Sequence, residues 1–165
     1  MGARIRGGFR DRYRLPQLAL HSPVGDLTVS EEDGAIVALD WGWGSLPQSA
    51  TPLLQRAREQ LHAYFDGALT AFDLPLAPAG TPYRRRVWQA LCDIPYGETC
   101  SYAAIAAAAG GSARSVGQAN GCNPIPIIIP CHRVVATTHL GGYSGGDGLT
   151  TKRFLLSLEA RDTLL

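Results

Sequence analysis

The chain has 165 residues, of which 45% are hydrophobic and 18% are charged. This length is enough for one or two compact domains, and this composition excludes a chain that is disordered throughout. The net charge of +1 excludes no class of partner, because attraction to nucleic acid depends on where the charges lie.

The charges are distributed unevenly along the chain. Residues 1–14 hold five Arg and one Asp (+4), residues 15–81 hold two Arg and eight acids (−6), and residues 82–165 hold eight basic and five acidic residues (+3). We therefore expect any contact with phosphate in the last part. Residues 1–14 are expected to be a frayed Arg-rich tail, since they lack the serines and the amphipathic order of a transit peptide.

The four cysteines predict neither a metal site nor a disulfide framework. They form no CxxC pair and have no His at metal-ligand spacing, so no metal is expected. The chain also has no apolar run of signal-peptide or membrane length, which predicts a cytoplasmic protein with reduced thiols and no membrane partner. In that setting a lone Cys with His beside it is a candidate nucleophile.

The first elements in chain order predict a small sheet with one helix. Residues 17–21, 27–30 and 35–41 are β-prone runs separated by turn sequences, and residues 52–64 carry apolar side chains at helical spacing. Residues 74–82 are rich in Pro, Ala and Gly and coincide with the change of charge. We therefore expect an N-terminal domain over residues 15–78 and a C-terminal domain over residues 79–165.

The second part of the sequence predicts helices. Helical spacing covers residues 83–91 and 150–160, and a Ser can cap each of two short helices over residues 101–109 and 112–121. Two short helices joined by a Gly-containing turn fit a helix-turn-helix. Spacing alone favours an ordinary αα-hairpin, because the DNA-binding motif is defined by its geometry.

The candidate nucleophile is Cys131, within Asn-Pro-Ile-Pro-Ile-Ile-Ile-Pro-Cys-His-Arg-Val-Val at residues 123–135. The apolar and Pro residues are expected to rigidify and dry its surroundings, while His132 and Arg133 are expected to lower the pKa of the thiol. In an extended strand Cys131 and His132 would face opposite sides, so a water would carry the proton between them. A buried, inert Cys is the alternative, and the Cys-His pair alone favours it.

Several motifs together resemble the O6-alkylguanine-DNA alkyltransferases, also called methylated-DNA–protein-cysteine methyltransferases. They are Gly-Thr-Pro-Tyr at 80–83, Val-Trp at 87–88, Ile-Pro-Tyr-Gly-Glu-Thr at 94–99, Ser-Tyr at 101–102, Ala-Arg-Ser-Val-Gly at 113–117, Asn-Pro at 123–124, Pro-Cys-His-Arg-Val at 130–134 and Gly-Tyr-Ser-Gly-Gly at 142–146. The resemblance covers about residues 80–159, and Ser-Pro-Val-Gly at 22–25 is similar to the N-terminal domain of the family.

The resemblance implies an α+β fold, with a ribonuclease-H-like N-terminal sheet and helix followed by a helical, winged-helix-like domain that carries a helix-turn-helix. It implies direct-reversal repair, in which a methyl or other alkyl group moves irreversibly from O6 of guanine, or O4 of thymine, to Cys131. The partner would be double-stranded DNA carrying O6-alkylguanine, with the damaged base flipped out of the duplex. No cofactor and no obligate protein partner are expected, and the protein would act as a monomer.

The resemblance also implies roles for individual residues around Cys131. His132 would take the thiol proton through a water, and Glu159 would hold the His tautomer. Asn123 would tie the helix-turn-helix to the active-site strand. The carbonyls of Cys131 and Val134 would accept from the exocyclic amine of the base. The implied alkylguanine pocket consists of Tyr102, Pro126, Val134, Tyr143 and Ser144.

The implied DNA contacts lie on the second helix of the helix-turn-helix. Arg114 would fill the space that the flipped base leaves. The other contacts would come from Ala113, Ser115, Gly117, Gln118, Ala119 and Asn120. The Gly-rich segment at 145–148 looks longer than in relatives, so the sequence leaves open which alkyl groups the pocket accepts.

Two other functions fit parts of the sequence. A lesion sensor would bind alkylguanine without repairing it, although non-catalytic relatives replace the acceptor Cys that this chain keeps. A Cys-His hydrolase would need an oxyanion hole and would release product repeatedly.

Overall fold

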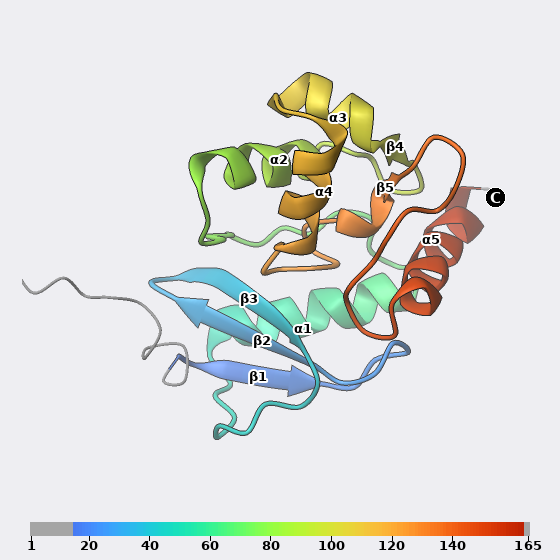
Figure 1. Ribbon diagram of the computed structural model, residues 1–165. Coiled ribbons are helices and arrows are strands. Elements are labelled where there is room, and N and C mark those ends of the chain that lie inside the picture. Colours follow the sequence, from blue (N-terminus) through green and yellow to red (C-terminus); the bar gives the residue numbers. More distant parts are fainter. Residues whose placement is uncertain (1–14, 164–165) are drawn as a thin grey trace, which may run out of the picture.

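The computed structural model describes residues 15–163, so the expected tail at residues 1–14 lies outside the described residues. Within that range no helix has both the length and the apolar character needed to cross a lipid bilayer. Figure 1 shows a small sheet with a helix along it, and the remaining helices above and beside this layer.

Three antiparallel strands form the predicted sheet. They are β1 (Gln17–Leu20), β2 (Leu27–Glu32) and β3 (Ala35–Trp41), in the order β1-β2-β3. Leu18 pairs with Val29 and Val29 with Leu39, so these apolar side chains share one face. The turn between β2 and β3 has positive φ at Asp33 and Gly34, which explains the Asp-Gly sequence there.

One helix, α1 (Pro52–Phe65), covers the apolar face of the sheet. Thr51 caps it by accepting from the N–H of Leu54 at 3.1 Å, and Pro52 occupies the first turn, where no amide donor is needed. Its inward stripe is buried and consists of Leu54, Ala57, Leu61 and Tyr64. The stripe brings Tyr64 to the end of α1 that lies beside α5 (Leu149–Thr163) in Figure 1.

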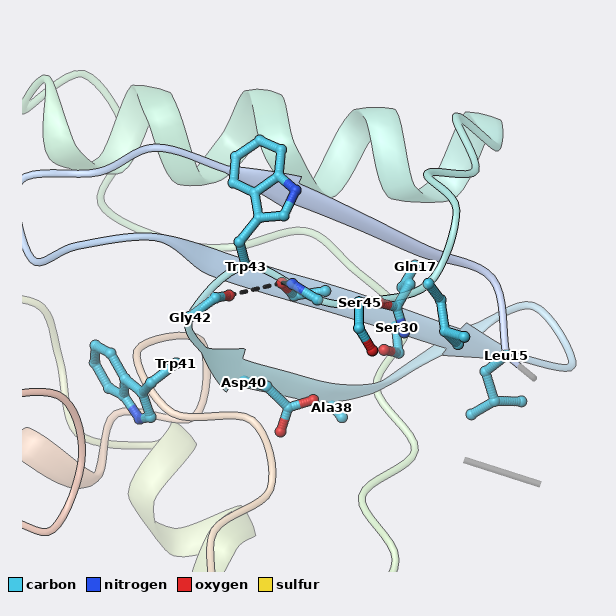
Figure 2. A pocket seen from close by; sticks show the side chains of 12 residues that line it. Leu15, Gln17, Ser30, Ala38, Asp40, Trp41, Gly42, Trp43 and Ser45 are labelled. Carbon is cyan, nitrogen blue, oxygen red and sulfur yellow. Dashed lines mark hydrogen bonds between the residues drawn. The ribbon is translucent and has the colours of Figure 1, made fainter. Parts of the chain in front are cut away.

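The opposite face of the sheet is polar and faces a loop over residues 42–49. The Thr28 hydroxyl donates to the carbonyl of Gly42 at 2.7 Å and accepts from the N–H of Gly44 at 2.8 Å. A cavity of about 320 Å³ lies between loop and sheet. Figure 2 shows Trp41 and Trp43, which both line this cavity, pointing in opposite directions at the end of β3.

Four helices and a short strand pair form the rest of the described chain. They are α2 (Pro82–Cys92), α3 (Tyr102–Ala109), α4 (Ala113–Gly121) and α5, with β4 (Cys100–Ser101) parallel to β5 (Val134–Val135). Ser101 caps α3, and Ser112 forms a capping box with Ser115 at the start of α4. A three-residue turn with positive φ at Gly110 and Gly111 joins α3 to α4. The predicted α+β fold is confirmed.

The segment that leads to Cys131 is not the extended strand that we expected. Cys131–Arg133 form a short 3-10 helix, η2, after a series of tight turns. Prolines at 124, 126 and 130 have no N–H to donate, so the segment cannot form a regular strand ladder. Ile127 has a φ of 72°, a costly conformation for a β-branched residue that surrounding contacts must hold.

Candidate active site and DNA-binding surface

A cavity of about 340 Å³ opens next to Cys131. Cys131 itself lies in η2, is only 5% exposed and lines this cavity. Four of the five predicted pocket residues lie together in its wall. The residues lining the cavity are Trp41, Tyr102, Gly117, Asn120, Gly121, Asn123, Pro126, Cys131, Gly142, Tyr143, Ser144 and Gly145.

Val134 is the predicted pocket residue that the structure places elsewhere. Its side chain is fully buried and does not line the cavity, because β5 pairs with β4 and turns the side chain into the core. Its carbonyl, expected to accept from the exocyclic amine of the base, accepts from Nζ of Lys152 at 2.7 Å. The side chain of Val134 therefore takes no part in the cavity, and the predicted contact of its carbonyl with the base stays a prediction.

Tyr102 is held in the wall by close contact with glycine. It is the first residue of α3, directly after the Ser101 cap. A Cβ on Gly141 would lie 2.8 Å from the Tyr102 hydroxyl oxygen, and one on Gly117 would lie 3.9 Å from its ring. Gly141 also has a φ of 79°, so a side chain there would be strained as well as crowded. The ring therefore lies between α4 and the loop before α5.

Behind Cys131, the predicted His–Glu pair is present and almost completely buried. Nε2 of His132 lies 2.5 Å from Oε2 of Glu159, with side-chain exposures of 0% and 1%. Oε2 also accepts from the Tyr64 hydroxyl at 2.6 Å, and Oε1 accepts from Nε of Arg133 at 2.7 Å. Burial favours a neutral Glu159, but the hydrogen bonds from His132, Arg133 and Tyr64 outweigh it and lower its pKa to about 2.

An ionised Glu159 determines which nitrogen of His132 carries the proton. The carboxylate can only accept, so Nε2 donates to it and Nδ1 remains an acceptor. Nδ1 is buried and has no hydrogen-bond partner among the described residues. Burial lowers the pKa of His132, with Glu159 opposing this effect and the charges of Arg133 and Lys152 adding to it. His132 is therefore a neutral ring that can accept a proton at Nδ1.

The thiol of Cys131 does not have the lowered pKa that we expected. Burial raises its pKa, and hydrogen bonding to Asn123, the charge of Lys152 and the hydroxyl of Tyr143 offset this only in part. The guanidinium of Arg133 is occupied elsewhere, by Glu159 and by the carbonyl of Ile94 at 2.8 Å. The isolated protein therefore holds a thiol, and a base must remove its proton.

The predicted active-site residue Asn123 and the predicted DNA contact Asn120 have structural partners that explain their position. Asn123 donates from Nδ2 to the carbonyl of Ile129 at 2.8 Å and accepts at Oδ1 from the N–H of Ile125 at 3.0 Å, so it braces the turns before Cys131. Asn120 of α4 donates to the carbonyl of Cys131 at 3.2 Å. The connection between the helix-turn-helix and the cysteine therefore runs through Asn120 as well as Asn123.

Only part of the predicted DNA-contact set lies on the surface of α4. Ala113, Arg114 and Gln118 are exposed, and Gly117 is half-buried beside them. Ala119 and Asn120 are buried, and the carbonyl of Ala119 accepts from Nε1 of Trp88 at 2.9 Å. Ala119 therefore faces α2, whereas Asn120 lines the Cys131 cavity, and the predicted contacts of both residues with DNA stay predictions.

Ser115 lies at the edge of the exposed face but has its own role in the helix-turn-helix. Its hydroxyl contacts the Tyr83 hydroxyl at 2.7 Å and closes the capping box with Ser112. The Tyr83 hydroxyl also donates to the carbonyl of Gly110 at 3.0 Å, so α2 holds the turn between α3 and α4.

The sequence interpretation did not identify three residues that the structure places at or behind the site. Lys152 is fully buried and donates to the carbonyls of Val134 and Gly142, at 2.7 and 3.1 Å. The sequence held a signal for the burial of Lys152. Lys152 and Glu159 lie seven residues apart, on the same helical face as the apolar, buried Leu155. Tyr64 and Trp41 carried no such signal, since both come from elements far away in the sequence.

Comparison with known proteins places both parts of the chain in one family. The family model described as 6-O-methylguanine DNA methyltransferase, ribonuclease-like domain, matches residues 17–78. The model described as 6-O-methylguanine DNA methyltransferase, DNA binding domain, matches residues 82–161.

Individual relatives are similar over most of their length. The constitutive methylated-DNA–protein-cysteine methyltransferase of Bacillus subtilis is 45% identical over 151 residues, covering 84% of this chain and 91% of the relative. The methylated-DNA–protein-cysteine methyltransferase of Methanosarcina barkeri is 43% identical over 150 residues, covering 85% and 94%. The crystal structure of Mycobacterium tuberculosis OGT in complex with DNA superposes with a TM-score of 0.81 at 42% identity, covering 90% and 94%.

Proposed function

The chain belongs to the 6-O-methylguanine DNA methyltransferase family, and we propose that it repairs DNA by moving an alkyl group from O6 of guanine to the thiol of Cys131. DNA is its partner and the reaction is that of a transferase. The observation that carries this assignment is the position of Cys131, in the lining of a cavity beside α4 and directly before His132 of the buried His132–Glu159 pair.

The reaction begins with removal of the thiol proton. His132 accepts it through a water at Nδ1, while Glu159 keeps Nε2 protonated and stabilises the imidazolium that forms. A general base is needed because burial raises the pKa of the Cys131 thiol. The unpartnered Nδ1 and the ionised Glu159 support this direction of proton transfer.

The thiolate then attacks the alkyl carbon in line with the C–O6 bond. A C–S bond forms, the C–O6 bond breaks, and its electron pair moves onto the guanine. The guanine takes up a proton from solvent, and the imidazolium of His132 returns the thiol proton to solvent, so the protons balance. The N–H of Ser144 donates to O6 and Tyr102 lies by N3 of the base, where hydrogen bonding stabilises the developing charge. The thioether is not readily cleaved, so each molecule acts once.

Duplex DNA is proposed to bind along the exposed face of α4. Reaching the lesion requires flipping the base out of the stack, at a cost of about a few kcal/mol. Arg114 is exposed at the start of α4 and would fill the vacated space. A Cβ added at Gly121 would meet no other atom within 4 Å, so this side of α4 leaves room for close approach of a groove. Ala113, Gly117 and Gln118 would provide the neighbouring contacts.

The proposal also covers the domain division, the oligomeric state and the location of the protein. We infer a division of the chain into residues 1–14, an N-terminal domain over 15–78 and an alkyltransferase domain over 79–165, which the ranges of the two matched models support. The protein is proposed to act as a monomer on O6-alkylguanine. A cytoplasmic location is proposed because the four cysteines are free thiols.

The test is a measurement of mass on each cysteine peptide after incubation with duplex DNA carrying O6-methylguanine. We expect a gain of about 14 Da, one methylene, on the Cys131 peptide in a 1:1 ratio with repaired lesions. Cys92 and Cys122, which are exposed, serve as internal controls and should gain nothing. Tight binding with the methyl group left on the DNA would identify a lesion sensor, and repeated release of product from an ester substrate would identify a hydrolase.

A further inference from the structure

Trp41 reaches the Cys131 cavity from the sheet. It is the last residue of β3 and lines the cavity together with Tyr143 and Gly145 of the loop before α5. It also lines the cavity of Figure 2 on the other side, and it is the one residue common to both linings. Trp41 therefore adjoins both cavities.

The indole occupies space that a side chain at position 145 would otherwise fill. A Cβ on Gly145 would lie 2.6 Å from Cζ2 of Trp41 and 2.8 Å from its Nε1, which no real contact allows. The indole also meets the Tyr143 ring edge to face, with centroids 6.4 Å apart and planes at 82°. Trp41 is therefore packed against the Gly-rich segment at 145–148. The sequence left open which alkyl groups the pocket accepts because of this segment.

Tyr143 connects Trp41 to the reacting sulfur. Its hydroxyl is buried, and Tyr143 lines the same cavity as Cys131 and meets the indole of Trp41 edge to face. A wall therefore runs from Cys131 through Tyr143 to Trp41. An alkyl group on O6 must lie beside the sulfur during transfer, so it lies along this wall.

The sheet fixes the position of the indole. Trp41 pairs with Leu27 of β2, and the N–H of Leu39 donates to the carbonyl of Pro124 at 2.9 Å, which ties β3 to the segment before Cys131. The wall cannot move outward without breaking these contacts. A packed interior is only slightly compressible, so such a wall sets a size limit.

We propose that Trp41 is a specificity-determining residue, whose indole limits the size of the alkyl group that the protein can transfer to Cys131. This inference rests on the proposed function. The cavity of about 340 Å³ must hold both the base and its alkyl group, and it lies at the small end of the range for ligand pockets. A methyl group fits beside the sulfur, whereas a benzyl group needs the volume that the indole fills.

The test compares single-turnover transfer from duplexes carrying O6-methylguanine and O6-benzylguanine. Trp41→Ala is expected to raise the benzyl-to-methyl rate ratio by roughly 10- to 100-fold, the range for steric discrimination in an apolar pocket. Trp43→Ala is the matched control, because Trp43 is 50% exposed, contacts the ring of His21 at 4.9 Å and does not line the Cys131 cavity. It should leave the ratio unchanged.

The outcomes separate this inference from the proposed function. If the parent protein transfers no methyl group, the proposed function fails. If the parent transfers methyl but Trp41→Ala leaves the ratio as it was, or Trp43→Ala raises it equally, the size limit does not reside in Trp41. Should Trp41→Ala fail to fold, Trp41→Phe decides the matter, because the smaller ring must raise the ratio in the same direction by a smaller factor.

Discussion

The hydroxyl of Tyr64 on α1 donates a 2.6 Å hydrogen bond to Oε2 of Glu159 on α5, across 95 residues of sequence. Both side chains are 1% exposed, and the same oxygen faces Nε2 of His132. The helix that covers the sheet therefore contributes a hydrogen-bond donor to the pair behind Cys131. Oε2 of Glu159 thus has two donors, Tyr64 and His132. Removal of the Tyr64 hydroxyl should strengthen the hydrogen bond between this oxygen and His132.

Tyr64→Phe is therefore expected to shift the acid limb of the alkyl-transfer rate profile to higher pH. Without the hydroxyl, Glu159 interacts more strongly with protonated His132 and raises its pKa. The free energy of unfolding should fall by about 1–3 kcal/mol, as for other lost hydrogen bonds to charged groups. Tyr83→Phe removes a hydroxyl that contacts Ser115 instead, so it should lower stability without moving the acid limb. If the acid limb of Tyr64→Phe stays at the parent pH, the Tyr64 hydroxyl contributes to stability and has no effect on the pKa of His132.

Glu159→Gln should remove one component of the dependence of stability on pH. The pKa of Glu159 is lowered on folding, to about 2, so its stabilising contribution is complete above the pKa of the unfolded chain. That contribution is lost as pH falls from about 4.5 toward 2, which urea unfolding at several pH values can measure. The curve for Glu159→Gln should be flatter in that window. Glu98→Gln, at an exposed carboxylate of the same part of the chain, makes the same change of charge and serves as the matched control.

Lys152→Met should make the Cys131 thiol still harder to ionise. The ammonium group favours the thiolate, so its loss raises the pKa of Cys131 further and slows methyl transfer at pH 7. It also leaves the carbonyls of Val134 and Gly142 without this donor, at a cost of about 1–3 kcal/mol in the free energy of unfolding. Alkylation of Cys131 by iodoacetamide as a function of pH measures the first effect. An unchanged profile for Cys131 would show that the lysine acts only through the two carbonyls.

Arg114→Ala should slow repair of duplex DNA by about tenfold or more and leave reaction with the free base O6-benzylguanine unchanged. The free base needs no flipping, so only the duplex reaction includes the step in which Arg114 fills the vacated space. Arg153→Ala, at an exposed Arg of α5, controls for the loss of one positive charge. Equal loss on both substrates would place Arg114 in the folding or chemistry of the site rather than in base extrusion.

The amino-acid sequence by itself determined the three-stranded sheet and the α-helices, and it indicated Cys131 and His132 as the candidate reacting groups. Strand β3 has the predicted bounds, 35–41, because Asp33-Gly34 can only be a tight turn before an apolar run. Helices α3 and α4 begin after Ser101 and Ser112, whose hydroxyls cap them as predicted. These are local properties of the chain, and the motifs around Cys131 are local as well.

Only the tertiary structure decided what surrounds those groups. The inward orientation of Ala119 depends on Trp88 of α2, and the raised pKa of the thiol depends on how deeply η2 is buried. The contacts of Tyr64 with Glu159 and of Trp41 with Gly145 join segments about 100 residues apart. Burial and pKa depend on the packing of all neighbours in space, so no local pattern of residues can encode them.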